Sequence, residues 1–302
     1  MNPILKISLA AVALLAVLGS APLALAAGAA MPEKPEKKSG EVKAAQPTVN
    51  KRCSDMTAEK RKKALADAKS AIAETEKALK ALDDKKSDEA LHSLALATGK
   101  LELILARDPK LALAPIGVSV VTYDILASED TIKTRIEEAK ALLKNGEVQQ
   151  ARKLMAGLAS EIEYRTTNIP LATYPSAIKA ITPLIDAGKI EEAKAGLQAA
   201  LSTLVVTTEA VPLPKLRAEY LLKESQGLAE KKNRSAAEND KLKKYLGEAR
   251  HQLKLAELLG YGNKDSYKSI YDQIADLEKK TSGGKSGKGW FDKLRGLMSK
   301  LF

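Results

Sequence analysis

The feature that most constrains this chain is one short motif that occurs three times. The motif is a turn, then acidic or amide residues, then an alanine that leads into an apolar helix; its copies contain Ala90, Ala151 and Ala193. Gly146 and Gly188 lie where the preceding helix would end, and glycine is the usual residue for the left-handed conformation at that position. Each copy therefore predicts two helices joined by a tight turn, an αα-hairpin.

The spacing between the copies is 61 and then 42 residues, which is too irregular for a solenoid array. We therefore expect three related helical hairpins packed into one bundle-like body. Three short β-favouring segments, 117–126, 161–174 and 204–214, interrupt the hairpins. They predict a small sheet of two or three strands that clips the hairpins together. The expected fold class is mainly α.

Helical patterns resume after Pro214 and include a capping box formed by Ser235 and Glu238. The expected helical domain spans residues 56–280. The glycine- and serine-rich stretch 281–289 predicts a flexible linker. Part of this stretch, from Gly283 to Ser286, resembles the end of a phosphate loop. A lysine occupies the position of that loop's first glycine, so no phosphate site is expected.

The N-terminal residues 1–26 have the pattern of a secretory signal peptide. Lys6 precedes an apolar stretch at 7–18, and small residues at 24–26 suit a cleavage site. An uncleaved membrane anchor is the alternative, but residues 19–22 interrupt the run before it reaches the ~20 apolar residues of a span. We expect cleavage after residue 26 and a periplasmic location.

Residues 27–55 contain proline, lysine and glutamate with little to bury, and they predict a flexible tether. This region holds Cys53, the single cysteine, so no intrachain disulfide can form. In an oxidising compartment the thiol could pair with another chain; the alternative is an incidental exposed thiol.

The net charge of +11 is concentrated at the two ends of the chain. Residues 31–63 and 279–302 hold most of the excess lysine and arginine, and the body between them is close to neutral. A nucleic-acid-binding protein would show a basic face on its folded body, so no nucleic-acid partner is expected. Basic ends on an exported protein fit anionic lipid headgroups or an acidic partner better.

The sequence contains no recognisable catalytic or metal-binding set. Neither His92 nor His251 lies in a zinc-binding pattern, and both are interpreted as ordinary surface or packed residues. A role in pH sensing is the weaker alternative for them. The adjacent carboxylates Asp83–Asp84 and Glu191–Glu192 fall at turns and helix starts, where the helix dipole accounts for them. We expect no enzymatic activity, no cofactor and no metal.

One tract is a candidate ligand groove. Tyr164, Arg165 and Tyr174 flank a proline-containing loop, and aromatic rings with a cation can line a small-molecule pocket. The alternative is a strand and turn that only orient the next helix.

The last thirteen residues hold both phenylalanines and the only tryptophan of the chain. On a helix, seven apolar residues of this segment share one arc of about 140°. This predicted docking face consists of Trp290, Phe291, Leu294, Leu297, Met298, Leu301 and Phe302. The predicted basic flank consists of Lys285, Lys288, Lys293, Arg295 and Lys300.

A helix of residues 290–302 is marginal alone in water, so another surface must cover its apolar face. Three surfaces could bury this face: a groove on the protein's own body or its oligomer, an anionic membrane surface, or another protein. The basic flank suits the membrane surface.

Three segments of the chain, 97–116, 169–222 and 282–298, resemble the YfdX family of bacterial exported proteins. The resemblance runs from about residue 60 to the C-terminus. It implies a mainly helical fold, a periplasmic location and an association with envelope stress, and it brings no catalytic motif.

The expected function is that of a non-catalytic, stress-associated binding or scaffold protein. We expect it to form a homo-oligomer and to dock through its C-terminal helix, with an anionic membrane surface or an envelope protein as further partners. The alternative is a protein that sequesters small amphipathic compounds or drugs in a groove between hairpins.

Overall fold

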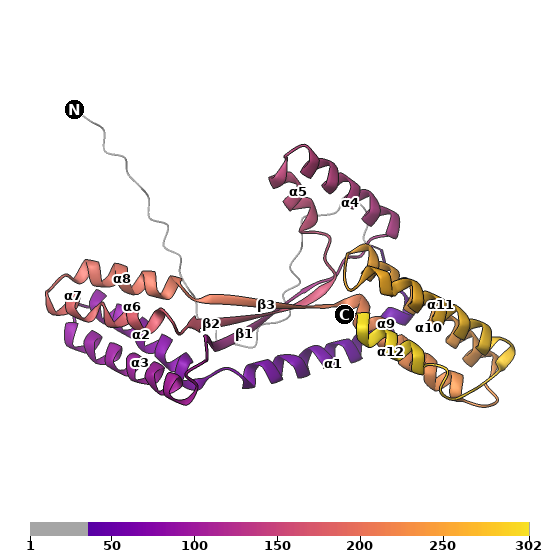
Figure 1. Cartoon of the computed structure of the whole chain (residues 1–302), viewed down its shortest axis with the longest axis horizontal. Helices are drawn as coiled ribbons and strands as arrows, with labels where there is room; N and C mark the ends of the chain where they lie inside the picture. The colour runs from indigo at the N-terminus through magenta and orange to yellow at the C-terminus, as the bar shows by residue number, and fades with distance from the viewer. Residues whose placement is uncertain (1–35, 302) are drawn as a thin grey trace.

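The computed structural model describes residues 36–301. Two helical lobes lie at opposite ends of a long three-stranded antiparallel sheet, and one helical hairpin protrudes from the sheet (Figure 1). The prediction of a mainly α fold with a small β element is confirmed. The signal peptide expected at residues 1–26, and residues 27–35 of the expected tether, lie outside the described residues.

Each copy of the repeated motif lies in a set of helices that leads into one strand of the sheet. The first unit contains α2 (Ala66–Asp83), α3 (Ser87–Arg107) and β1 (Leu113–Tyr123). The second contains α4 (Glu129–Lys144), α5 (Val148–Met155) and β2 (Glu161–Pro170). The third contains α6 (Tyr174–Lys179), α7 (Thr182–Asp186), α8 (Ile190–Ser202) and β3 (Val205–Pro212). The sequence motif thus marks a repeated helix–helix–strand unit.

The turns of the three units share one backbone geometry. Lys85, Gly146 and Gly188 all have positive φ, of 60°, 79° and 71°. In each turn the amide of this residue donates to the carbonyl three positions earlier, and the next amide donates to the carbonyl five positions earlier. This is the Schellman pattern that ends an α-helix. The hairpins predicted at the three motifs are therefore formed.

The sheet has the order β1-β2-β3, and both pairs of strands are antiparallel. Tyr164 at its centre pairs with Val120 on one side and Glu209 on the other. Because β1 and β3 run in one direction and β2 in the other, the helices that precede β1 and β3 lie at one end of the sheet. The α4–α5 hairpin lies at the opposite end (Figure 1).

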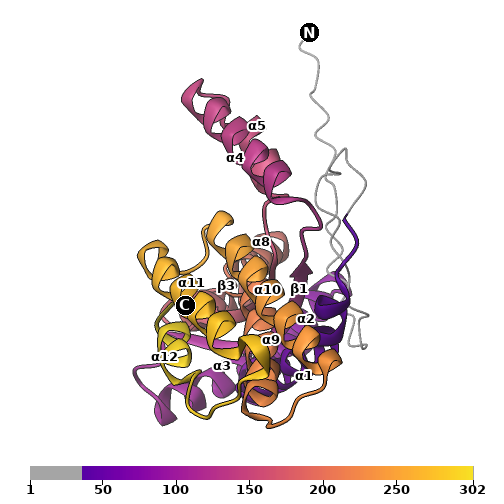
Figure 2. The same ribbon diagram turned by 90° about the vertical axis from the view of Figure 1, so that its right-hand side faces the viewer.

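The first lobe is the packing of α2 and α3 against α6, α7 and α8 around a shared alanine- and leucine-rich core. The expectation that all three hairpins form one body is correct for the first and third and wrong for the second. The α4–α5 hairpin protrudes from the molecule (Figure 2), since the direction of β2 places it at the other end of the sheet, and it touches the second lobe only at the base of α4.

A long helix, α1 (Gly40–Lys62), occupies most of the expected tether. The Ser39 hydroxyl caps it by accepting from the Val42 amide at 3.0 Å. Val42, Ala45 and Val49 are buried at helical spacing, and Val49 packs in a cluster with residues of the sheet and of α9. The predicted tether is therefore replaced by a packed helix from Gly40 onward.

The second lobe follows β3 directly. It consists of α9 (Leu213–Glu230), α10 (Ala236–Leu258), α11 (Tyr267–Thr281) and α12 (Asp292–Leu301), with 3₁₀ turns η1 (Lys264–Ser266) and η2 (Ser282–Gly284). The predicted capping box is present at the start of α10, where Ser235 and Glu238 hydrogen-bond reciprocally. The four helices share a second core, separate from that of the first lobe.

A buried ion cluster holds the junction between the sheet and the second lobe. Asp124, next to the end of β1, accepts hydrogen bonds at 2.7 Å from Arg217 Nη2 of α9 and at 2.7 Å from Lys38 Nζ. The Ser160 hydroxyl donates to the other carboxylate oxygen at 3.4 Å. The side chains of Asp124 and Arg217 are 8% and 3% exposed. This cluster ties the start of the described chain, the sheet and α9 together.

Candidate functional site

An open groove runs along α10 and α11, beside the base of the protruding hairpin. It has a volume of about 550 Å³ and is lined by Glu129, Gly247, Arg250, His251, Lys254, Tyr271, Asp272 and Ala275. A second depression of about 520 Å³ shares Lys254, Tyr271 and Asp272 with it and extends to Lys264 and Lys268. Because the two depressions share these three residues, we describe them together as the α10–α11 groove.

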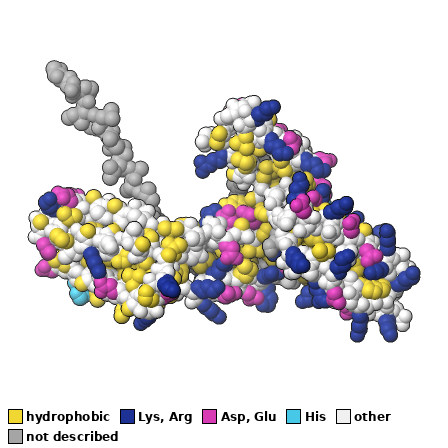
Figure 3. Space-filling view, viewed as in Figure 1, with side chains coloured by type: hydrophobic (Ala, Val, Ile, Leu, Met, Phe, Trp, Pro, Cys, Tyr) yellow, Lys and Arg dark blue, Asp and Glu magenta, His cyan; other side chains and the backbone are white. Residues whose placement is uncertain are grey.

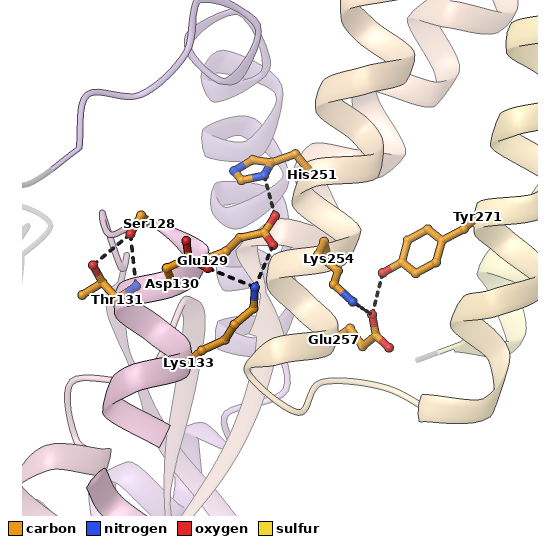
Figure 4. Close-up of polar contacts among 9 residues, drawn as sticks. All are labelled: Ser128, Glu129, Asp130, Thr131, Lys133, His251, Lys254, Glu257 and Tyr271. Atoms are coloured by element: carbon orange, nitrogen blue, oxygen red, sulfur yellow. Dashed lines mark hydrogen bonds and ion pairs between the residues drawn. The ribbon is translucent and has the colours of Figure 1, made fainter. Parts of the chain in front are cut away.

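One wall of the groove is a contact between α4 and α10. Ser128 caps α4, its hydroxyl accepting from the Thr131 amide at 3.1 Å, so that Glu129 sits in the first turn (Figure 4). A carboxylate is stabilised at this end of a helix. Glu129 Oε1 lies 3.2 Å from His251 Nδ1 of α10. The two residues are 122 positions apart in the sequence, and no local pattern predicts their contact.

The other wall is a polar cluster around Glu257. Its Oε2 accepts from Lys254 Nζ at 2.8 Å and from the Tyr271 hydroxyl at 3.0 Å (Figure 4). Burial, and then the hydrogen bond with Glu257, raises the pKa of Tyr271 above its ordinary value. Burial alone would raise the pKa of Glu257, but the hydrogen bonds from Lys254 and Tyr271 outweigh it and the pKa is lowered. The phenol is therefore neutral and the carboxylate ionised at neutral pH.

Two cations in the groove, Arg250 and Lys254, are paired with carboxylates of the same protein. Arg250 Nη2 lies 3.0 Å from a Glu278 oxygen, and Lys254 is held by Glu257. A proton-transfer catalyst needs a group whose pKa lies near the working pH, and the pKa of Tyr271 is shifted away from it. Among residues 36–301 there is also no group of three or more His, Cys, Asp or Glu that could hold a metal ion. The arrangement is suited to binding an apolar ring over Tyr271.

The three residues expected to line one ligand groove do not meet. Tyr164 is buried between the sheet and α1, where burial, and then its hydrogen bond with Cys53, raises its pKa. Arg165 lies on the opposite face of β2, where its Nη2 donates to the Tyr123 hydroxyl at 3.0 Å. Tyr174 is buried in the first lobe, and burial raises its pKa to about 12. Neighbouring residues of a strand face opposite sides, so the common groove is not formed.

Cys53 and His92, which were also considered from the sequence, both lie outside the groove. Cys53 is half-buried on α1 and packs with Tyr164, so it is not the freely exposed thiol of one interpretation. His92 is exposed on α3. Neither lines the α10–α11 groove.

The predicted docking face packs on the protein's own second lobe. Phe291, Leu294, Met298 and Leu301 are buried against α9, α10 and α11, and Trp290 and Leu297 are partly buried there. Phe302 lies outside the described residues. In this structure the apolar face therefore packs on the protein's own body, the first of the three alternatives considered from the sequence. The helix α12 begins at Asp292, not at Trp290.

The expected linker before this helix is fastened at several points. The Gly287 amide donates to the Ala229 carbonyl at 3.1 Å, and Arg234 Nη2 donates to the Lys285 carbonyl at 2.6 Å. A methyl group at Gly287 would overlap the indole ring of Trp290, so the glycine allows the ring to pack there. The basic flank stays exposed at all five positions: Lys285, Lys288, Lys293, Arg295 and Lys300.

Within residues 36–301, no helix has both the length and the apolar composition that crossing a membrane requires. The model of the YfdX protein family matches residues 71–210, which is nearly all of the three helix–helix–strand units. A solved structure of Salmonella Typhi YfdX has 20% sequence identity to this chain. The match covers 50% of this chain and 93% of the Salmonella protein, with a TM-score of 0.34. None of the curated proteins matches the sequence.

Proposed function

Because this chain belongs to the YfdX family through residues 71–210, we propose that it is a stress-associated, non-catalytic binding or scaffold protein of the periplasm that self-associates. The observation that carries the binding role is the α10–α11 groove. Two of its cations, Arg250 and Lys254, are paired with carboxylates of the protein, and the phenol of Tyr271 stays neutral, which supports a role in binding. The periplasmic location rests on the signal-peptide pattern of residues 1–26.

The C-terminal helix supports this role by packing on the second lobe, which contains the groove. Its apolar face packs in the core that α9, α10 and α11 share, and α10 and α11 line the groove together with Glu129 of α4. The exposed basic flank is left to meet an acidic envelope partner or an anionic membrane surface by charge. The apolar face is not available for that contact while it is docked.

The proposal predicts a processed, assembled protein. Protein recovered from the periplasm should have an intact mass that lacks about the first 26 residues, and light scattering should give a mass larger than one chain. The same chain expressed without residues 1–26 serves as a control and should assemble equally from the cytoplasm. An unprocessed N-terminus, or a single-chain mass at every concentration, would contradict the proposal.

The α10–α11 groove favours a second candidate function, the sequestration of small amphipathic compounds. Tyr271 offers an aromatic face, and Lys254 Nζ lies 5.9 Å from the centre of that ring, so a flat, anionic molecule would meet both an apolar and a cationic contact. This candidate replaces the groove expected around Tyr164.

We expect Tyr271→Ser to weaken binding of the anionic dye 8-anilinonaphthalene-1-sulfonate about fivefold or more, because it removes the aromatic floor of the groove. Fluorescence titration measures the change. The matched control is Tyr220→Ser on α9, a partly buried tyrosine outside the groove. Equal affinities of both variants and the unaltered protein would remove the groove as the binding site.

A further inference from the structure

The three repeat units can be compared position by position, since their turns have the same hydrogen bonds. Three residues before the turn residue with positive φ, the units carry Leu82, Leu143 and Ile185. Nine residues after it they carry Leu94, Met155 and Leu197. Both positions are apolar in every unit, and the hairpins therefore carry the same pair of core residues.

Their burial differs sharply between the units. Leu82 and Ile185 are 2% and 3% exposed, whereas Leu143 of the second unit is 45% exposed. Leu94 and Leu197 are 2% and 0% exposed, whereas Met155 is 43% exposed. Val148, in the first turn of α5, is 53% exposed as well. In the space-filling view, apolar side chains gather on the protrusion formed by α4 and α5 (Figure 3).

The reason is the absence of a partner hairpin in the described part of the chain. The first and third units bury these positions against each other, in one shared core. The second unit lies at the other end of the sheet, where only the base of α4 is covered, by Leu255 of α10 against Ile132. The face formed by Leu143, Val148 and Met155 is here called the open hairpin face, and at the positions of Leu143 and Met155 it is as apolar as the paired faces.

The charge of the hairpin helps to select the occupant. Residues 129–155 contain six lysines and arginines and five aspartates and glutamates, so the net charge is close to zero. Several of them pair within α4, such as Lys140 with Glu137 at 2.7 Å. A second identical hairpin would meet little repulsion, whereas an anionic membrane or a strongly charged partner would gain little attraction.

We propose that the open hairpin face binds the open hairpin face of a second copy of this chain. The contact would be twofold symmetric and would reproduce between two chains the packing of equivalent hairpins seen within the first lobe. The inference rests on the proposed self-association and assigns a surface to it. Because a single hairpin is a small interface, the dimer should be concentration-dependent.

The test is sedimentation velocity over a range of concentrations. The double variant Leu143→Glu with Met155→Glu places like charges on both sides of the contact, and we expect it to weaken dimerisation at least tenfold. The matched control is Leu96→Glu with Leu103→Glu, which changes two exposed leucines of α3. The control should dimerise as the unaltered protein does.

Cross-linking tests the same face without introducing charge. In a Cys53→Ser background, Val148→Cys should form disulfide-linked dimers on mild oxidation, and Thr134→Cys, at an exposed position on the other side of α4, should not.

Two results would overturn the inference in different ways. If the protein assembles but the double variant assembles equally well and Val148→Cys does not cross-link, the surface assignment fails while self-association stands. If the unaltered protein is a single chain at every concentration, the inference fails together with the self-association on which it rests.

Discussion

Replacing Asp124 by alanine is expected to destabilise the protein by ~3–5 kcal/mol, because it leaves a buried guanidinium without its counter-ion. Arg217 is 3% exposed, and its Nε already has no hydrogen-bond partner among the described residues, so the side chain cannot regain its lost contact in place. Lys38 loses the same carboxylate. Urea unfolding followed by circular dichroism at neutral pH measures the change.

The matched control is Asp130→Ala, which removes an aspartate that is 93% exposed and paired with Lys133. It should change the unfolding free energy by ~0.5 kcal/mol or less. The double variant Asp124→Leu with Arg217→Met should be more stable than Asp124→Ala, since no charge is left buried alone. An effect of Asp124→Ala no larger than that of Asp130→Ala would refute the structural role of the cluster.

The same cluster predicts a dependence of stability on pH. Burial alone would raise the pKa of Asp124, but the hydrogen bonds and charges of Arg217 and Lys38 outweigh it, and the pKa is lowered. A carboxylate with a depressed pKa in the folded state contributes its full stability above the unfolded value of ~3.9 and loses it as the pH falls through the folded value. The difference between the unaltered protein and Asp124→Ala should therefore shrink below pH ~4.

Phe291→Ala is expected to destabilise the second lobe by ~3–5 kcal/mol, because it removes a ring that is almost fully buried beneath α9, α10 and α11. Trp290 is the only tryptophan and its neighbour, so its fluorescence reports the same region. We expect blue-shifted emission from the unaltered protein and a red shift in the variant. Anionic vesicles should leave the emission of the unaltered protein unchanged, since its apolar face is already covered.

Lys293→Ala is the control, because this side chain of α12 is exposed. It should leave both the unfolding curve and the emission spectrum as they are. A red emission from the unaltered protein that turns blue with anionic vesicles would show that the terminal helix is free in solution and binds the membrane surface instead.

The hairpins could be predicted from the sequence because their signal is local. Gly146 and Gly188 mark helix ends that need a left-handed residue, and the structure has those ends. In the first unit Lys85 adopts the same conformation without a glycine, so the motif is less visible there. The strands were also predicted within a few residues. What the local pattern does not contain is the direction of each strand, which separates the second hairpin from the others.

The helix α1 was missed for a related reason. Its sequence includes Pro47, which lacks an amide hydrogen and ordinarily disfavours a helix interior. Its apolar residues are few, and it owes its stability to surfaces far along the chain, such as the cluster of Val49 with Tyr164 and Leu216. Contacts of that kind cannot be read from residues 40–62 alone.

In the candidate site, too, local features can be predicted from the sequence and contacts between distant segments cannot. The apolar character of the C-terminal segment is visible in the sequence, and six of the seven predicted residues lie in the described part of the chain, where they are buried or partly buried in the second lobe. The opposite directions of Tyr164 and Arg165 follow from strand geometry and could have been anticipated. The contact of Glu129 with His251 could not, because it joins two helices that meet only in the folded chain.

Because strand direction alternates, whether every hairpin has a partner at its end of the sheet depends on whether the number of repeat units is even or odd. In an antiparallel sheet, every second unit projects its hairpin from the same end, so an even number of units leaves both ends equally populated. The described chain has three, and α10 packs only against the base of the unmatched hairpin. Adding a fourth unit after β3 would bring a hairpin beside α4 and α5 and close that end within one molecule. Two copies of the chain together contain six units, which is also an even number. The odd number of units in one chain, which leaves its second hairpin without a partner, would therefore limit a closed assembly to two copies.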